Sequence, residues 1–313
     1  LEDHGLAYEV YSNIKPNPTI ENVQTGVKAF QDSKADYIIA IGGGSSMDTA
    51  KAIGIIAKNP EFADVRSLEG TAPTKNRAVF TIAVPTTAGT AAEVTINYVI
   101  TDPEKNRKFV CVDPHDIPQI AVIDPDMMST MPKGLTAATG MDALTHAIEG
   151  YITKGHCTIS DMFHLEAIKL ISQSLRGAVQ NTPEGREGMA LGQYIAGMGF
   201  SNVGLGIVHS MAHKTGAAFA DYGAHIIHGA ANAMYLPKVI AFNAKNPEAK
   251  KRYGVIADEM KLGGSNDDEK VKLLIEYLRG MNDALNIPHC IQHYGPDSYP
   301  TEQGFVPENV FLE

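Results

Sequence analysis

The sequence has few cysteines and no long apolar segment. Its three cysteines, Cys111, Cys157 and Cys290, are odd in number, widely spaced and free of a C-x-x-C pair. This usage indicates a reducing compartment, and we expect a cytoplasmic protein. The longest apolar runs, such as 37–41 and 79–84, are only strand-sized, whereas a membrane-spanning helix needs about 20 residues. We therefore expect no membrane segment, and no signal peptide is recognised at the start.

The sequence also lacks an excess of positive charge. Lys and Arg number 26 against 36 Asp and Glu, a net charge of −10. Such a charge opposes attraction to nucleic acid phosphates and to anionic lipid, so neither a nucleic acid nor a membrane is an expected partner. The composition, 44% hydrophobic and 20% charged, is that of an ordinary globular protein. At about 100–200 residues per domain, the length suggests two domains.

Strands and helices alternate in residues 1–130. Apolar residues recur at helical spacing from Ile20 to Phe30, and the apolar run 37–41 that follows predicts a buried strand. Ser45 and Asp48 resemble a capping box that begins a further helix. We also expect strands at 6–11, 79–84 and 120–123, and an antiparallel pair at 95–101 and 108–112. The pattern indicates an α/β domain with a mostly parallel sheet.

Residues 131–313 follow a different pattern, because apolar residues recur every three or four positions and β-branched runs become scarce. An all-helical second domain is therefore expected. The helices predicted in it are 135–151, 160–175, 188–201, 207–217, 230–243 and 267–285.

A glycine-rich turn follows the predicted strand 37–41. From Ile39 to Asp48 the chain reads Ile-Ala-Ile-Gly-Gly-Gly-Ser-Ser-Met-Asp. A helix that begins after such a turn presents backbone N–H groups and a positive dipole end to a phosphate. The segment is not a G-x-G-x-x-G fingerprint, since Met47 replaces the third glycine, and it lacks the Gly-Lys-Ser/Thr of a P-loop. A phosphate-binding turn and a merely tight, well-capped turn are both open readings of this segment.

A second strand ends in small and hydroxyl residues. The segment 84–90 reads Val-Pro-Thr-Thr-Ala-Gly-Thr, so Thr86, Thr87 and Thr90 could bind a pyrophosphate or a ribose, although capping would also explain them. Ligands of open α/β sheets bind beyond the carboxyl ends of the strands. Two such strand ends favour a dinucleotide cradle.

Histidines gather in the second half of the chain. Asp142 and His146 stand four apart and so share one helix face, while His209 and His213 are again one turn apart and precede His225 and His228. A structural role would explain Asp142 and His146 alone, but the added histidines favour a metal site. Imidazoles with one carboxylate suit Fe(II) or Zn(II) better than Mg(II) or Ca(II).

No His-Glu-x-x-His motif is present, which disfavours a metalloprotease. The remaining histidines form no comparable cluster with a carboxylate, and we interpret them as structural or solvated: His4, His115, His156, His164, His289 and His293.

The sequence resembles the iron-dependent (group III) alcohol dehydrogenases, most closely their lactaldehyde-reducing branch. Three stretches carry the resemblance: 42–51 with Gly-Gly-Gly-Ser, 85–102 around Pro-Thr-Thr-x-Gly-Thr, and 140–150 with Asp-Ala-Leu-Thr-His-Ala-Ile-Glu. The similarity is dense from 59 to 118 and extends through 197–202 to about 243. The resemblance implies the dehydroquinate synthase-like architecture: an α/β dinucleotide-binding domain over 1–130, then an all-α metal-binding domain over 131–313. It also implies that the family's first strand and last helices lie outside this sequence.

The resemblance implies a role for particular residues. The implied metal ligands are Asp142, His146, His209 and His228, with His213 as a proton relay. The implied contacts to NAD(H) are Asn17, Gly43, Gly44, Ser45, Asp48, Thr86, Thr87, Thr90, Thr95, Asn97, Val99 and Lys108. Asn97, Val99 and Phe200 would line the substrate end. The implied reaction reduces a short aldehyde such as lactaldehyde to 1,2-propanediol, or the reverse, with Fe(II) or alternatively Zn(II), in a homodimer.

The sequence departs from the family pattern in one loop. Residues 217–227 are several residues longer than in the lactaldehyde-reducing branch, which makes His225 an alternative to His228 as fourth ligand. The segment that would bind the adenosine ribose is absent from this sequence. The choice of NAD over NADP is therefore inferred from the resemblance and not read from a residue. Three other readings are open: a glycerol or 1,3-propanediol dehydrogenase or dehydroquinate synthase type, a metal-dependent hydrolase, and a catalytically incomplete chain acting only as a metal-binding subunit.

Overall fold

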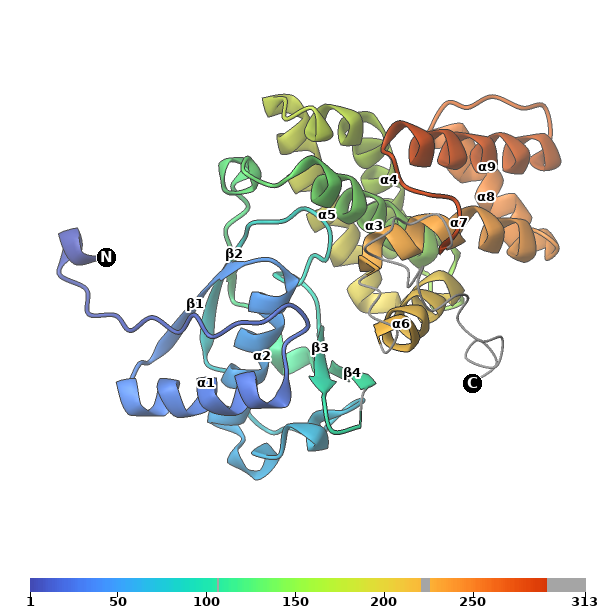
Figure 1. Ribbon diagram of the computed structural model, residues 1–313. Coiled ribbons are helices and arrows are strands. Elements are labelled where there is room, and N and C mark those ends of the chain that lie inside the picture. The colour runs from blue at the N-terminus through green and yellow to red at the C-terminus, as the bar shows by residue number, and fades with distance from the viewer. Residues whose placement is uncertain (106, 221–225, 292–313) are drawn as a thin grey trace, which may run out of the picture. The chain divides into compact units, whose positions relative to one another are not determined.

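The computed structural model describes residues 1–105, 107–220 and 226–291. Contacts divide the chain into two compact units (Figure 1): 1–86 with 92–127, and 87–91 with the chain from Met128 onward. The division into two domains, residues 1–130 and residues 131–313, stays a prediction. No helix in the described part of the chain has both the length and the apolar composition needed to cross a membrane.

The first unit contains a parallel sheet. Its strands β1 (Tyr37–Gly42), β2 (Phe80–Pro85) and β5 (Ile120–Ala121) are ordered β1-β2-β5 and pair in parallel. Helix α2 (Gly44–Lys58) connects β1 to β2, and Gly42 of β1 pairs with Pro85 of β2. The two glycine- and threonine-rich segments therefore begin at neighbouring strand ends, as the sequence predicted.

Helix α1 and an antiparallel hairpin complete the first unit. Helix α1 (Ile20–Ser33) begins at Thr19, which forms a capping box with Asn22. Strands β3 (Asn97–Asp102) and β4 (Arg107–Val112) pair antiparallel, which confirms the expected pair. The buried residues that pack α1, α2 and the hairpin together include Val23, Ile55, Ile56, Tyr98, Ile100 and Phe109. Short 3-10 turns span Glu2–His4, Pro60–Phe62, Val65–Leu68, Pro114–Asp116 and Pro125–Met128.

Three local predictions for the first unit were wrong. Residues 6–11 form no strand, and Leu6, Tyr8 and Val10 are exposed because no strand among the described residues pairs with them. Strand β1 is not buried, since it lies at the edge of the described sheet and Ile41 is 56% exposed. Helix α2 has no capping box, because its N-cap is Gly43, which has no side chain, and Ser45 lies inside the first turn. The Asp48 carboxylate accepts a hydrogen bond from Val99 N.

The second unit is built from helices, as the sequence predicted. They are α3 (Lys133–Ile152), α4 (Thr158–Val179), α5 (Pro183–Val203), α6 (Ile207–Ala220), α7 (His228–Asn243), α8 (Pro247–Glu259) and α9 (Asp267–Ala284). Only α8 was missed, because its sequence is highly charged. Its Asn246 N-cap followed by Pro247 is nevertheless a recognisable start signal.

Helix α3 lies at the centre of the second unit. It packs against α4, α5 and α7, and most of its residues are buried all round its axis. A helix that is buried on every side places any polar residue it carries in the protein interior. The polar residues of α3 therefore need partners from the surrounding helices.

Candidate metal centre

Helix α3 brings one carboxylate and one imidazole to the same buried face. Asp142 and His146 are one turn apart and only 3% and 6% exposed. The Nε2 atom of His146 lies 4.0 Å from Oδ1 of Asp142. Burying an ionised carboxylate without a partner is unfavourable, so this arrangement indicates a cation or several donors nearby.

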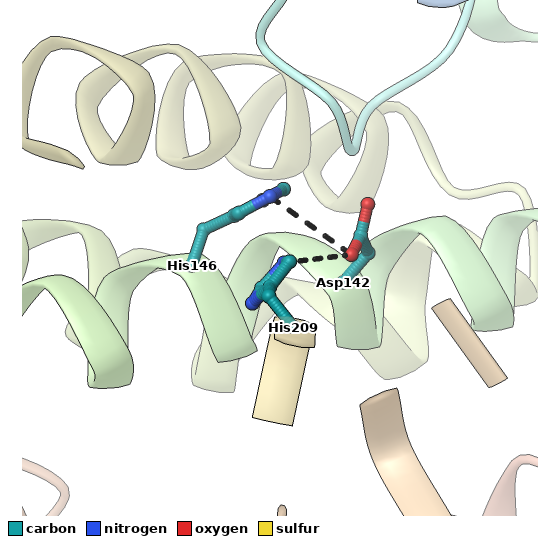
Figure 2. A group of neighbouring side chains, drawn as sticks. All are labelled: Asp142, His146 and His209. Carbon is teal, nitrogen blue, oxygen red and sulfur yellow. Dashed lines mark ion pairs between the residues drawn. The ribbon is translucent and has the colours of Figure 1, made fainter. Parts of the chain in front are cut away.

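Helix α6 supplies a second imidazole to the same carboxylate oxygen. The Nε2 atom of His209 lies 3.5 Å from Oδ1 of Asp142, and the ligand atoms of Asp142, His146 and His209 all lie within 4.8 Å of one another. Figure 2 shows the two imidazoles directed toward the carboxylate. Ligand atoms about 2.0–2.2 Å from one tetrahedral ion lie about 3.3–3.6 Å apart. The observed separations are close to those of a metal site.

His228, the first residue of α7, adds a third imidazole. Its Nε2 atom lies 3.8 Å from Oδ1 of Asp142, and its side chain is 35% exposed. The helix start comes this close to α3 because Gly229 has no side chain: a Cβ there would lie 2.0 Å from the Ala138 carbonyl oxygen. His228 lies outside the tighter group of three, and His225 lies outside the described residues. His228 therefore lies near the carboxylate, and its role as the fourth ligand stays a prediction.

The contacts of Asn232 show which atoms converge at the centre of this group. Its Nδ2 atom lies 2.7 Å from Oδ1 of Asp142, 3.1 Å from Nε2 of His209 and 3.2 Å from Nε2 of His228. An amide group has two hydrogens and cannot donate fully to three acceptors. Because the carboxylate oxygen and the Nε2 atoms of two imidazoles converge here, the donor set fits a divalent ion once those nitrogens are deprotonated.

The charges of the three central residues depend on one another. Burial raises the pKa of Asp142, but His146 and His209 outweigh burial and hold it below the usual range. Burial lowers the pKa of His146 to about 4. Burial also lowers the pKa of His209, but hydrogen bonds to Asp142 and Glu149 overcome it and raise the value to about 9. Asp142 is thus ionised and His146 neutral, the forms that a metal ion binds.

Two further predicted residues lie beside the imidazoles. Phe200 of α5 stacks on His146, with ring centroids 4.3 Å apart and ring planes 14° apart. The His213 ring lies 4.6 Å from that of His228. The structure therefore brings Phe200 and His213 to the histidine group, whereas their roles in substrate binding and proton transfer stay predictions.

The predicted cofactor residues of the first unit lie at two places. Gly43 caps α2, Gly44 and Ser45 form its first turn, and Thr86 N donates to the Gly42 carbonyl oxygen. At the second place, Lys108 Nζ lies 2.7 Å from Oδ1 of Asn17, which joins residues far apart in the sequence. Thr87 and Thr90 belong to the second unit. Cofactor contact by these residues stays a prediction.

The remaining predicted cofactor residues surround a lysine to which the sequence analysis gives no role. The buried Lys51 Nζ donates to the Thr95 and Asn97 carbonyl oxygens, and the Thr95 side chain is itself buried. Val99 N donates to Asp48, as noted above. This hydrogen bonding explains Thr95 and Asp48 as structural residues, and their contact with a cofactor stays a prediction.

Sequence reasoning also assigns no role to Glu149, which the structure places against His209. The signal was present, because Asp142, His146 and Glu149 follow the i, i+4, i+7 spacing of one helix face.

The site and the fold together define a class of protein. In the helical unit, one buried carboxylate and the converging imidazoles could hold a metal ion. The other unit carries parallel strands that end in glycine- and threonine-rich turns. This combination is that of a metal-dependent, nucleotide-using oxidoreductase.

Family models identify the chain. A model described as "Iron-containing alcohol dehydrogenase" matches residues 1–125, and one described as "Fe-containing alcohol dehydrogenase family, C-terminal" matches residues 136–303. The chain belongs to the iron-containing alcohol dehydrogenases, which confirms the resemblance, the reaction class and the fold class.

Known relatives agree with this assignment. The chain is 55% identical to the lactaldehyde reductase of Escherichia coli (strain K12) over 295 residues, 94% of this chain and 76% of that protein. It is 42% identical to an NADPH-dependent butanol dehydrogenase of Clostridium saccharobutylicum, over 94% of this chain and 74% of that protein. The crystal structure of a 1,3-propanediol oxidoreductase superposes with a TM-score of 0.87 at 36% identity, covering 94% and 76% of the two chains.

Proposed function

We propose that this protein reduces a short aldehyde such as lactaldehyde to 1,2-propanediol, and catalyses the reverse reaction, with NAD(H) and Fe(II). The convergence of His146, His209 and His228 on Oδ1 of Asp142 is the observation that carries this proposal. The 55% identity to a lactaldehyde reductase supports the choice of aldehyde. Zn(II) is the alternative metal, since it accepts the same ligands.

The side chains of the centre divide into those that would hold the ion and those that would contact the substrate. Asp142, His146, His209 and His228 would hold the ion. When bound, the ion supplies a Lewis acid for the carbonyl oxygen, and NADH supplies a hydride for the carbonyl carbon. Phe200 fixes the ring of His146 by stacking and would line the substrate end together with Asn97 and Val99.

His213 would supply the proton that the reduced substrate needs. Its ring is half-buried and lies 4.6 Å from His228, and imidazoles are common proton-transfer groups in enzymes. A group at this place can pass a proton between solvent and the substrate oxygen.

The glycine turn after β1 and the threonine segment after β2 would bind the dinucleotide, with Gly43, Gly44, Ser45 and Thr86 nearest the phosphates. The paired ends Gly42 and Pro85 support this proposal, since parallel strand ends are the usual ligand edge. NAD(H) is our choice over NADP(H). One relative is NADPH-dependent, so KM values for both coenzymes must be compared.

A second candidate is oxidation of a polyol such as glycerol or 1,3-propanediol. The fold match to a 1,3-propanediol oxidoreductase is the observation that favours it. Comparing kcat/KM for 1,2-propanediol, 1,3-propanediol and glycerol with NAD would separate the two candidates.

We also propose a cytoplasmic homodimer with no nucleic acid or membrane partner. Cys111 and Cys157 form no disulfide in the described part of the chain, which suits a reducing compartment. Light scattering after size exclusion would give the oligomeric state, and limited proteolysis between residues 120 and 135 would test the division into two domains. A monomeric mass would reject the homodimer.

The decisive experiment follows NADH oxidation by lactaldehyde with protein stripped of metal and reloaded anaerobically with Fe(II) or Zn(II). Activity that returns only with a metal supports the reaction, the cofactor and the site together. If metal binds but no activity returns with lactaldehyde or the polyols, the chain acts only as a metal-binding subunit and the proposed reaction is wrong.

A further inference from the structure

Glu149 is a buried carboxylate directly behind the candidate metal centre. It lies seven residues after Asp142 on α3 and is 6% exposed. Neither the sequence pattern nor the proposed reaction requires a second carboxylate here. An ionised carboxylate in such a place must be held by several donors.

In the described part of the chain, three hydrogen bonds to the Glu149 carboxylate come from the beginning of α6. Val208 N donates to Oε1 at 2.7 Å, and His209 N donates to Oε2 at 3.2 Å. The first amides of a helix have no partner within the helix, and a negative charge near them is favourable. Glu149 therefore caps α6 from a different helix and fixes where α6 begins.

The third hydrogen bond reaches the imidazole itself. Nδ1 of His209 lies 2.7 Å from Oε2 of Glu149, while Nε2 of the same ring faces Oδ1 of Asp142 at 3.5 Å. A carboxylate acceptor keeps a hydrogen on Nδ1 and leaves the lone pair of Nε2 for a metal. Carboxylates behind histidine ligands commonly orient the ring and strengthen metal binding.

We propose that Glu149 is the positioning residue of the metal centre, setting both the place of α6 and the orientation of the His209 ring. One helix then supplies two metal ligands and also the group that orients a third ligand from another helix. The inference rests on the proposed metal-binding function of Asp142, His146 and His209.

Gly206 offers a way to test Glu149 without changing any polar group. A Cβ atom at position 206 would lie 2.8 Å from Oε1 of Glu149, closer than a real contact allows. Gly206→Ala should therefore push the carboxylate away from His209. Gly280→Ala is a matched control, because in the described part of the chain a Cβ at that position meets nothing within 4 Å apart from its chain neighbours and its own helix backbone.

Glu149→Gln removes the charge and keeps the shape. Its matched control is Asp161→Asn, which removes a partly buried carboxylate of the same unit that is bound to Arg252. Both substitutions should lower the thermal stability of metal-free protein, but only the first should change metal binding.

The experiment titrates Co(II) into each stripped protein and records the visible absorption of the bound ion. We expect Glu149→Gln and Gly206→Ala to raise the Kd for Co(II) by about 10–100-fold and to change the spectrum. Gly280→Ala and Asp161→Asn should match wild type. Near-ultraviolet circular dichroism of the metal-free proteins confirms that each variant is folded.

Three results would contradict the proposed role of Glu149. If wild type binds no Co(II), Fe(II) or Zn(II), the proposed metal site is wrong and the positioning role falls with it. If wild type binds metal and folded Glu149→Gln binds it equally well with an unchanged spectrum, only the positioning role is wrong. If Asp161→Asn weakens binding as much as Glu149→Gln, the effect is general destabilisation and Glu149 has no special role.

Discussion

The ring of Phe200 stacks face to face on the imidazole of His146, with centroids 4.3 Å apart. Phe200 is 4% exposed, so the stack lies inside the protein and limits how His146 can turn. The aromatic ring therefore contributes to stability and to the orientation of a metal ligand.

Replacing Phe200 with Ala should lower the free energy of unfolding by about 3–5 kcal/mol, as expected for a lost buried aromatic ring. It should also weaken metal retention because His146 gains freedom. Thermal unfolding and metal analysis after dialysis measure the two effects, and Phe200→Leu should be milder in both. Unchanged metal retention in the Ala variant would show that the ring does not orient His146.

His146→Ala should remove bound metal and nearly all turnover, because the site loses one of its three buried ligands. Metal content and NADH oxidation are measured on the same preparation. His156→Ala is the control, since that histidine lies beside Asp161 rather than in the cluster. Full activity of metal-free His146→Ala protein would refute the assignment.

Metal affinity should rise with pH. Hydrogen bonds to Asp142 and Glu149 outweigh burial and raise the pKa of His209 to about 9 in the metal-free protein, so a proton must leave before the ion binds. The affinity for Co(II) should increase about tenfold per pH unit below pH 9 and then level off, because one proton is displaced. Calorimetry in buffers of different ionisation enthalpy should detect that proton. An affinity independent of pH between 6 and 9 would contradict the prediction.

Stability of the first unit should fall as the pH rises from about 4 to about 7. Burial raises the pKa of Asp48 and of Asp116 to about 7, against the lowering effect of Lys51, from 3.8. Between these values the folded state holds protons that the unfolded chain has lost, so unfolding becomes easier as the pH rises.

Asp116→Asn should flatten this dependence by about 1–4 kcal/mol, since one pKa unit corresponds to about 1.4 kcal/mol. Urea unfolding at pH 4 and pH 7.5 measures the difference. Asp126→Asn, at an exposed position, is the control. An equal slope in wild type and Asp116→Asn would mean that Asp116 is already ionised in the folded protein at pH 4.

His213→Gln should keep the metal but lower kcat by about 10²-fold, the low end of general acid–base contributions. The variant should also change the pH dependence of kcat, because it removes the proposed proton-transfer group. Loss of metal instead would make His213 a ligand rather than a proton relay.

Regular elements followed from local patterns. The 3.6-residue spacing of apolar residues predicted α3 to α7 and α9, and Thr19 with Pro18 marks the start of α1. Strand β1 was wrongly predicted to be buried. A run of apolar residues predicts a strand, but it does not show whether a neighbouring element covers that strand.

The candidate site was predicted in part. Asp142 and His146 share a helix face by spacing alone, and the concentration of histidines further along the chain favoured a metal site. The resemblance to the family then selected His209 and His228 as ligands. The role of Glu149 was not predicted, because its contact with His209 spans 60 residues and no local pattern reports such a contact.

The sequence by itself determined which residue types this protein has and predicted where most of them lie: one carboxylate and one imidazole on α3, further imidazoles on α6, and His228 just before the helix that becomes α7. Only the tertiary structure decided that three imidazoles meet one carboxylate oxygen, that Asn232 lies among them and that Glu149 lies behind His209. The physical reason is that the face on which a residue lies is set by the periodicity of its own helix. How closely α3, α6 and α7 approach one another depends instead on packing between helices and on the absence of side chains at Gly206 and Gly229.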